Sequence, residues 1–259
     1  MTNLKGLFVV INAKTITITF LALLSTYICL KYDIKADFPL TLLATAVVFP
    51  IVFSIGGAYK RRESALNEYA AIKGNGQSIY FAVRDWVEGA DEKMLERARA
   101  VLGNLLRATD TMLSGDISNF RERETKVYES FSDLSAFIRE ELRGRGLAGG
   151  EVSRVNQYLS KMMVAFEKLK HIYQYRTPRT LRTFSDLFIK ILPPLYGPYF
   201  AHVADKYTPG YGLEYITPVL FTLVLVSLDN IQNNLENPFD KIGRDDITIS
   251  VDEYVSRLR

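Results

Sequence analysis

The sequence predicts an all-α membrane protein with about four transmembrane helices and a water-soluble helical block between the two pairs. Residues 38–59 contain no charged side chain, whereas residues 60–176 are charged almost throughout. A soluble globule mixes the two classes because each element has a wet and a dry face, so this segregation indicates two solvents. Apolar residues in the charged block recur every three or four positions, and strand-like alternation is sustained nowhere.

The first two predicted spans lie close together near the N-terminus. The first covers residues 15–30, with a start as early as residue 7 also compatible, and the second covers residues 38–59. The second has about the ~20 residues that cross a ~30 Å hydrocarbon layer. A polar stretch, 31–37, joins them into a hairpin. The first apolar run is too long for a cleavable signal peptide and lacks a small-residue cleavage site, so we expect it to stay in the mature protein.

A basic cluster, Lys60, Arg61 and Arg62, follows the second span directly. Basic clusters at the end of a span prefer the cytoplasm. We therefore expect the loop at 31–37 outside and the charged block inside the cell. An even number of spans then places both termini in the cytoplasm of a multi-pass protein of the cell (inner or plasma) membrane.

Four amphipathic helices are predicted within residues 61–176. The first begins around Ala65, Asp116 caps the third, a glycine-rich stretch at 144–150 ends it, and the fourth stops before Pro178. The apolar positions at helical spacing in the last three helices are Met94, Leu95, Ala98, Val101, Leu102, Leu105 and Leu106; Ile117, Phe120, Val127, Phe131, Leu134, Phe137 and Ile138; and Val152, Val155, Leu159, Met162, Met163, Phe166 and Leu169.

The last two predicted spans, 183–204 and 215–228, are less purely apolar. Asp186, Lys190 and three prolines interrupt the first, and the second runs into Asp229. Such residues are typical of helices that bury a polar face in protein or line water. The predicted domains are a first transmembrane hairpin (1–59), a cytoplasmic helical region (60–176), a second transmembrane helix pair (177–229) and a cytoplasmic C-terminal tail (230–259).

Several function classes are disfavoured by composition and motifs. The formal net charge of +3 is too small to indicate nucleic-acid binding. The chain lacks the GxSxG, GxxxxGK[ST] and HExxH motifs, so we expect no enzyme and no catalytic residues. One cysteine and two distant histidines argue against a disulfide framework and against a histidine-rich metal site.

The second span carries a phenylalanine pair on one helix face. Phe49, Phe53 and Gly57 are four residues apart, and Pro50 loosens the turn before it. Phenylalanines from several copies that meet on an axis would form a ring, and an apolar ring can gate a pore by dewetting. Apolar pairs at this spacing are also the commonest packing pattern. From these residues alone, both interpretations stay open.

Arginines recur every three residues before the third span, at Arg176, Arg179 and Arg182. Clustered positive charge raises the local concentration of anions. The same arginines also fit a basic cytoplasmic flank of the span, and the two interpretations are compatible.

The tail contains an acidic turn with Asn237, Asp240, Asp245 and Asp246. Oxygen-rich turns can hold calcium, but the twelve-residue spacing and closing glutamate of an EF-hand are absent. A solvated helix end followed by a loop explains the same residues.

Taken together, the chain resembles the bestrophin family of anion channels, in its shorter prokaryotic branch. Three stretches carry the resemblance: 49–56, similar to the family's neck segment; 177–178, similar to its Thr-Pro element; and 235–247, similar to its Asn/Asp-Pro-Phe-Gly and acidic segment. The chain departs from the family at three positions. Gly57 replaces a third neck hydrophobe, Thr180 a proline, and Asp240 a glycine.

The resemblance implies a homopentamer that passes chloride and other small monovalent anions through one axial pore across the lipid bilayer. The competing interpretation is a non-conducting membrane scaffold, which would not require the symmetric oligomer that an axial pore needs. No cofactor is expected, because Lys241 and Arg244 dilute the acidic turn that would hold calcium. The residues implied are a neck of Phe49, Phe53 and Gly57; an anion-attracting flank of Lys60, Arg61, Arg62, Arg179 and Arg182; a second constriction near Val152 and Val155; and a turn similar to a calcium clasp, with Asn237, Asp240, Asp245 and Asp246.

Overall fold

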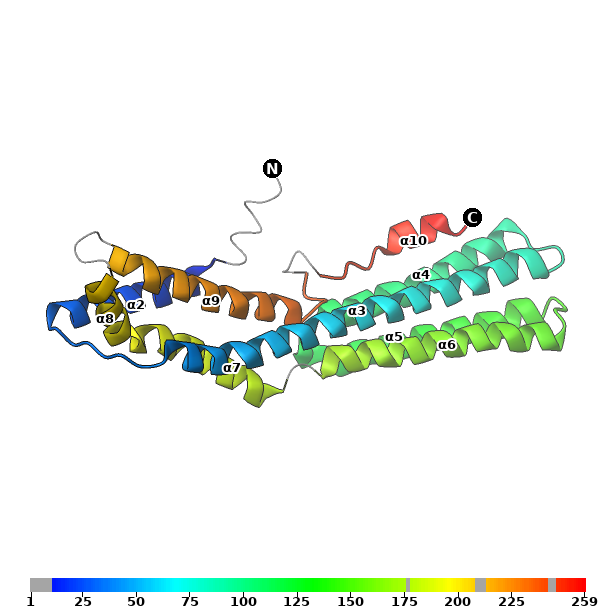
Figure 1. Ribbon diagram of the computed structural model, residues 1–259. Coiled ribbons are helices and arrows are strands. Elements are labelled where there is room, and N and C mark those ends of the chain that lie inside the picture. The colour runs from blue at the N-terminus through cyan, green and yellow to red at the C-terminus, as the bar shows by residue number, and fades with distance from the viewer. Residues whose placement is uncertain (1–10, 176–177, 208–212, 242–245) are drawn as a thin grey trace. The chain divides into compact units, whose positions relative to one another are not determined.

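The computed structural model describes residues 11–175, 178–207, 213–241 and 246–259 (Figure 1). The described residues form two compact units. The apolar unit takes its described residues from the segments Met1–Lys60 and Arg176–Asn237, and the polar unit takes them from Arg61–Tyr175, Pro238–Ile242 and Asp246–Arg259.

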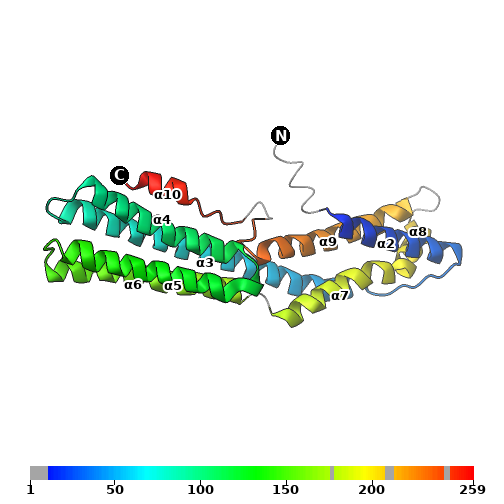
Figure 2. The same cartoon turned by 180° about the vertical axis from the view of Figure 1, so that it is seen from behind.

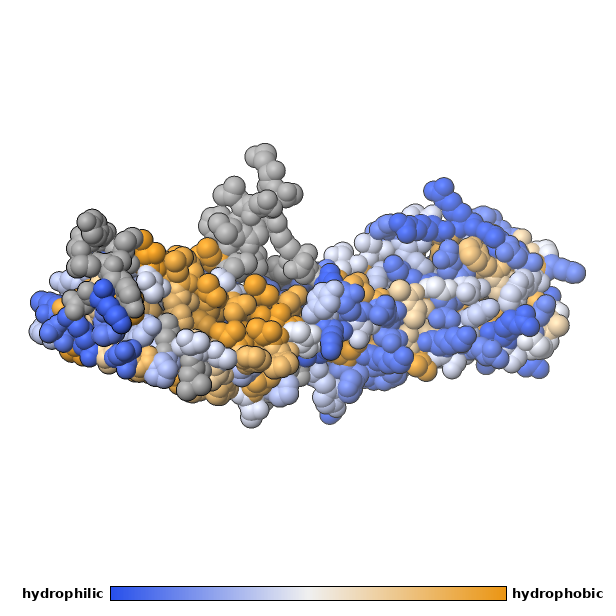
Figure 3. All heavy atoms as spheres, viewed as in Figure 1, coloured by the Kyte–Doolittle hydropathy of each residue, from blue (hydrophilic) through white to orange (hydrophobic). Residues whose placement is uncertain are grey.

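The two units differ in surface chemistry. Hydrophobic residues gather over the apolar unit and hydrophilic residues over the polar unit (Figure 3). Three helices among the described residues are long and apolar enough to cross a membrane, namely Ala13–Lys31, Leu43–Trp86 and Ile216–Glu236. All regular structure in the described residues is helical. The predicted all-α membrane class is confirmed.

The apolar unit contains four helices and the first part of a fifth. Its first helix begins with a capping box, in which the Asn12 side chain accepts a hydrogen bond from the Thr15 amide at 3.2 Å and the Thr15 hydroxyl accepts one from the Asn12 amide at 3.3 Å. The elements are α2 (Ala13–Lys31), the first part of α3 (Leu40–Trp86), α7 (Arg179–Leu195), α8 (Gly197–Tyr207), a 3₁₀ turn (Leu213–Tyr215) and α9 (Ile216–Glu236).

Helix α3 does not break where the second span was expected to end. It continues through the basic cluster at 60–62 to Trp86. The sequence after Lys60 carries good helix formers, and the buried residues Ala65, Tyr69 and Ile72 keep the helical spacing. The basic cluster therefore marks the passage from the apolar unit to the polar unit within one helix.

The predicted third span forms two helices, α7 and α8, instead of one. Pro193 and Pro194 lack the amide hydrogen that an uninterrupted helix needs. The chain turns at Tyr196, and the Ser25 hydroxyl on α2 donates a hydrogen bond to the Pro194 carbonyl at 2.6 Å. A Cβ atom on Gly197 would lie 2.2 Å from Ser25 Oγ, so glycine lets α8 approach α2 closely.

The core of the apolar unit joins α2, α3, α7, α8 and α9. Tyr196 is fully buried, and its ring contacts those of Phe38, Phe200 and Phe221 at centroid distances of 4.8 to 6.3 Å. Such aromatic contacts stabilise beyond the area that they bury. The aliphatic part of this core comprises Ile18, Val47, Ile51, Ile189, Leu192, Leu225 and Val226.

The polar unit is a helical bundle. Figures 1 and 2 show α3 beside α4 and α5 beside α6. Its elements are the rest of α3, α4 (Glu92–Ser114), a 3₁₀ turn (Ile117–Asn119), α5 (Phe120–Phe137), a π-helical turn (Ile138–Arg143), α6 (Gly149–Gln174) and α10 (Val251–Arg257).

The predicted apolar stripes of the polar unit pack into one core. Leu102 and Leu106 of α4, Phe131 of α5 and Phe166 of α6 are buried in it, as expected. Ile117 is an exception and is exposed, because it lies in the 3₁₀ turn that Asp116 caps and not in α5 itself. Burial of such side chains is the main source of stability in a bundle of this kind.

The C-terminal segment, residues 246–259, packs against α3 and α4 within the polar unit. Tyr254 of α10 is buried, and its hydroxyl approaches α3 at Gly76. A Cβ atom at position 76 would lie 2.5 Å from the Tyr254 hydroxyl oxygen. Arg99 of α4 donates a hydrogen bond from Nε to the Leu258 carbonyl at 3.0 Å. Glycine at position 76 therefore permits this close packing.

Candidate pore-lining surface

The first part of α3 has one buried and one exposed face. Val47, Ile51 and Ala58 are buried inside the apolar unit, at the spacing of one helix face. On the opposite face, Phe49 is 56% exposed and Phe53 is 72% exposed. The chain itself thus leaves these two phenylalanines uncovered on this face of α3.

The two phenylalanine rings lie together on this face. Their centroids are 6.0 Å apart and their planes are tilted by 39°. A contiguous apolar surface of this kind on a folded chain is covered by lipid or by another protein surface.

Gly56 and Lys60 continue this face along the helix. A Cβ atom on Gly56 would meet nothing within 4 Å, and Lys60 is exposed about one turn further along. Gly57 is half-buried, because at about 3.6 residues per turn the eighth residue after Phe49 has rotated away from it, whereas the seventh has not. We refer to Phe49, Phe53, Gly56 and Lys60 as the neck face.

The rest of the basic cluster is partly engaged. Arg61 and Arg62 are half-buried, and Arg62 Nη1 lies 3.0 Å from the Glu63 carboxylate. Lys60 is therefore the member of the cluster with the most exposed charge.

The arginines predicted to flank the third span are not joined to this cluster by any contact among the described residues; Arg179 and Arg182 lie in the first turn of α7. Arg182 Nη1 lies 2.9 Å from the Glu236 carboxylate of α9, which is buried, and Nη2 donates to Asn233 at 3.2 Å. Its charge is thus balanced inside the apolar unit, which gives it a structural role beside any effect on anions. Arg176 lies outside the described residues, and so does the side chain of Arg179.

The positions predicted for a second constriction lie on α6. Val152 and Val155 are both buried in the core of the polar unit. A side chain buried within its own subunit has no free face to present to a passage between subunits. The structure places both valines in packing positions.

The acidic turn of the tail is described only in part. Asn237, Asp240 and Asp246 are half-buried, and Asp245 lies outside the described residues. Lys241, next to the turn, forms a 2.9 Å ion pair with Asp110 of α4. No group of three or more acidic, histidine or cysteine side chains is arranged to hold a metal ion in the part of the chain that the structure describes.

A polar cluster in the apolar unit was only partly foreseen. The Lys14 ammonium on α2 lies 2.6 Å from Asp229 of α9 and 2.7 Å from Asp186 of α7. Beside it, the Asn230 amide donates to the Thr15 hydroxyl at 3.1 Å. The two aspartates in apolar runs predicted a polar face buried in protein. No sequence signal identified Lys14 as their partner.

Solved structures of bacterial bestrophin homologs from Klebsiella pneumoniae match the chain over nearly its full length. Two single-residue variants give TM-scores of 0.78 and 0.79 at 17% and 14% sequence identity; the matches cover 95% of this chain and 99% and 98% of theirs. A third structure, phased with zinc, gives 0.72 at 12% identity, with 95% and 94% covered. No protein-family model and no curated protein matches the chain. The likeness shows that the chain has the fold of these bestrophin homologs.

Proposed function

We propose that this chain, which has the fold of bacterial bestrophin homologs, assembles as a homopentamer that passes chloride and other small monovalent anions through an axial pore. The neck face is the observation that carries the proposal. Phe49 and Phe53 are largely exposed, although the opposite face of the same helix is buried. In the proposed assembly, the neck faces of neighbouring copies turn toward one axis and leave a narrow apolar passage.

The mechanism follows from the chemistry of that passage. An anion that enters it loses part of its water, because Phe49 and Phe53 offer no hydrogen bonds. Aromatic ring edges carry partial positive charge and compensate part of this loss. Lys60, at the end of the neck face, raises the local concentration of anions. Larger, weakly hydrated anions should pass more easily, since dehydration costs them less.

The proposed topology places the basic cluster at 60–62 on the cytoplasmic side, together with both termini. In this topology the apolar unit lies in the plasma membrane and the polar unit lies in the cytoplasm. The proposal involves no cofactor and no catalytic step, because passive flux needs only a passage and a driving gradient.

Ion flux into liposomes tests the proposal directly. Purified protein should let chloride cross in response to a chloride gradient, with sodium flux close to that of protein-free liposomes. Sodium flux above chloride flux would overturn the proposed sign of the ion. Absence of flux for both ions would overturn the channel itself.

Stoichiometry tests the assembly independently of flux. The mass of the protein in mild detergent should correspond to five copies of the 29.4 kDa chain. A single copy under the same conditions would exclude an axial pore, because such a pore requires a symmetric oligomer. That result would favour the scaffold, in which the neck face packs against a partner protein.

A further inference from the structure

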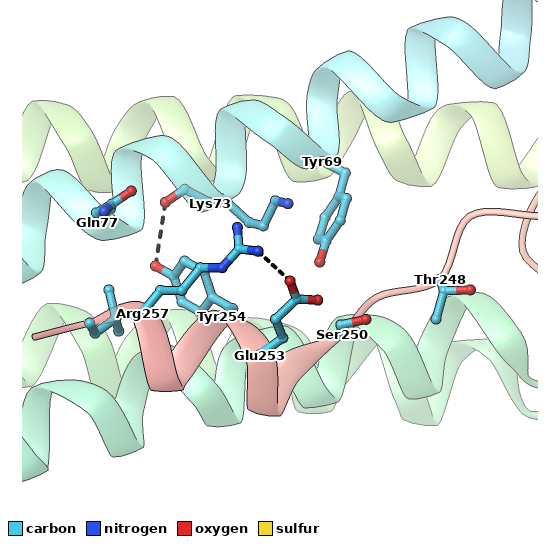
Figure 4. Close-up of a pocket in the computed structure, with 9 residues that line it drawn as sticks. Tyr69, Lys73, Gln77, Thr248, Ser250, Glu253, Tyr254 and Arg257 are labelled. Carbon is cyan, nitrogen blue, oxygen red and sulfur yellow. Dashed lines mark hydrogen bonds and ion pairs between the residues drawn. The ribbon is translucent and has the colours of Figure 1, made fainter.

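A cavity of about 170 Å³ lies between α3 and the C-terminal segment of the polar unit (Figure 4). Its α3 wall includes Tyr69, Lys73 and Gln77, and its other wall includes Glu253 and Arg257 of α10. None of these residues belongs to the neck face. The proposed channel therefore leaves the cavity without a role.

The walls of the cavity are held in place by packing. Tyr254 and Leu258 are buried beside it, and the Tyr254 hydroxyl donates to the Lys73 carbonyl at 3.4 Å. Burial also raises the pKa of Tyr254 above its ordinary value, so its phenol stays neutral over a wider pH range than an exposed tyrosine. The cavity is thus a defined feature of the folded unit and not a gap beside a loose tail.

The cavity has a surplus of positive charge. Figure 4 shows Lys73 and Arg257 reaching into the space between α3 and α10. Arg257 forms an ion pair with Glu253 on its own helix. The Lys73 ammonium lies 4.4 Å from the centre of the Tyr69 ring and has no ion-pair partner among the residues that the structure describes. Lys73 and Arg257 carry two positive charges and Glu253 one negative charge, so the charged side chains that line the cavity sum to +1.

The remaining groups suit a small polar molecule. Tyr69 and Ser250 supply hydroxyls and Gln77 supplies an amide, so the wall offers both donors and acceptors. The volume is below the roughly 300–1,000 Å³ of cavities that hold drug-sized ligands. A molecule with one anionic group and a few further heavy atoms fits both the size and the charge.

We propose that this cavity binds a small molecule through an oxyanion, a carboxylate or a phosphate group, held between the Lys73 ammonium and the Arg257 guanidinium. Gln77 and Tyr69 hydrogen-bond the same molecule. The ligand bridges α3 and the C-terminal segment, and so strengthens the attachment of α10. Charge-assisted hydrogen bonds of this kind are the strongest that such a wall can offer.

Binding by the purified full-length protein in detergent tests the proposal. The probes are sodium acetate, sodium succinate and sodium phosphate, each titrated against sodium chloride at equal ionic strength. At least one probe should bind saturably, and the preferred probe distinguishes carboxylate from phosphate. Lys73→Gln should weaken that binding about tenfold, because one charged partner is lost. Lys93→Gln, a matched change at an exposed lysine of α4, should leave it unchanged.

Hydrogen exchange gives a second readout. The saturating probe should slow amide exchange in α10, because the ligand bridges it to α3. If Lys73→Gln lowers the melting temperature of the protein without ligand, Gln77→Ala replaces it as the test variant. Gln77→Ala should weaken binding of the same probe several-fold. Absence of saturable binding by all three probes would overturn the proposal, as would an equal loss in Lys93→Gln. Neither result bears on ion flux.

Discussion

The Lys14 ammonium on α2 lies 2.6 Å from the carboxylate of Asp229 on α9, whose side chain is only 4% exposed. Asp186 of α7 contacts the same ammonium at 2.7 Å. Three helices of the apolar unit therefore meet at one lysine. Charges buried in this way are stable only while each has its partner.

Lys14→Gln should lower the free energy of unfolding by roughly 3 kcal/mol, because it leaves the buried Asp229 carboxylate without its main cation. Thermal unfolding in detergent measures the change. Lys190→Gln is the matched control. Its 2.5 Å pair with Asp186 is half-exposed, and exposed pairs contribute at most about 1 kcal/mol.

The double variant Lys14→Gln with Asp229→Asn should lose less stability than the two single variants added together. Removing both charges leaves neither one buried alone. Strictly additive losses would show that the pair does not interact in the folded chain.

Phe53→Ala should make anion flux several-fold faster and less selective among anions, because it widens the proposed neck and reduces dehydration. Liposome flux with chloride and a larger anion measures both effects. Val224→Ala, at an exposed position of α9, is the control and should change neither. Unchanged selectivity in Phe53→Ala would count against the neck assignment.

Gly56→Leu should reduce flux without destabilising the subunit. A Cβ atom at this position meets nothing within 4 Å in its own chain, and leucine is a better helix former than glycine. Gly197→Ala should by contrast destabilise the protein, because the new Cβ atom would lie 2.2 Å from Ser25 Oγ. We expect it to lower the free energy of unfolding by about 1–3 kcal/mol. A folded Gly56→Leu protein with normal flux would indicate that the neck face contacts lipid.

Lys170 gives a pH-dependent contribution to stability. Burial disfavours its charged form, but its hydrogen bonds with Glu167, Tyr128 and Glu124 outweigh this and raise the pKa of Lys170. Lys170→Met should therefore lower the free energy of unfolding by about 1–3 kcal/mol at pH 7.

The sign of the pH dependence follows from the raised pKa of Lys170. Its contribution is fully present below the ordinary lysine pKa of about 10.4 and is lost as the pH rises through the raised value. The free energy of unfolding is measured for the unchanged protein and for Lys170→Met from pH 6 to pH 11. The difference between the two free energies should stay constant up to about pH 10 and become smaller above it. A difference that already narrows between pH 7 and pH 9 would contradict this account.

The helices of the polar unit were predictable because their evidence is local. Leu102, Phe131 and Phe166 recur with their neighbours at helical spacing, and burial follows from that spacing. The continuity of α3 was not predicted. The basic cluster at 60–62 marks the point where the chain passes from the apolar unit to the polar unit. A helix can continue through such a point without a turn, as α3 does.

The contacts that organise the apolar unit lie far apart in the sequence. Lys14 and Asp229 are separated by 215 residues, and Ser25 and the Pro194 carbonyl by 169. Periodicity says which face of a helix is buried but not which residue it meets there. A count of four also drifts around a helix that has about 3.6 residues per turn, so the predicted neck position Gly57 is half-buried and its neighbour Gly56 is exposed.

Gly76 of α3 packs against the C-terminal segment of the chain. Any side chain at that position would displace the Tyr254 hydroxyl, and its Cβ would also lie 3.3 Å from Leu102 of α4 and 3.4 Å from Met162 of α6. Natural variants of this fold that end before α10 should accept alanine there more readily, whereas those that keep the tyrosine should keep the glycine. Related sequences with glycine at position 76 and tyrosine at position 254 should therefore be those in which α10 packs against α3.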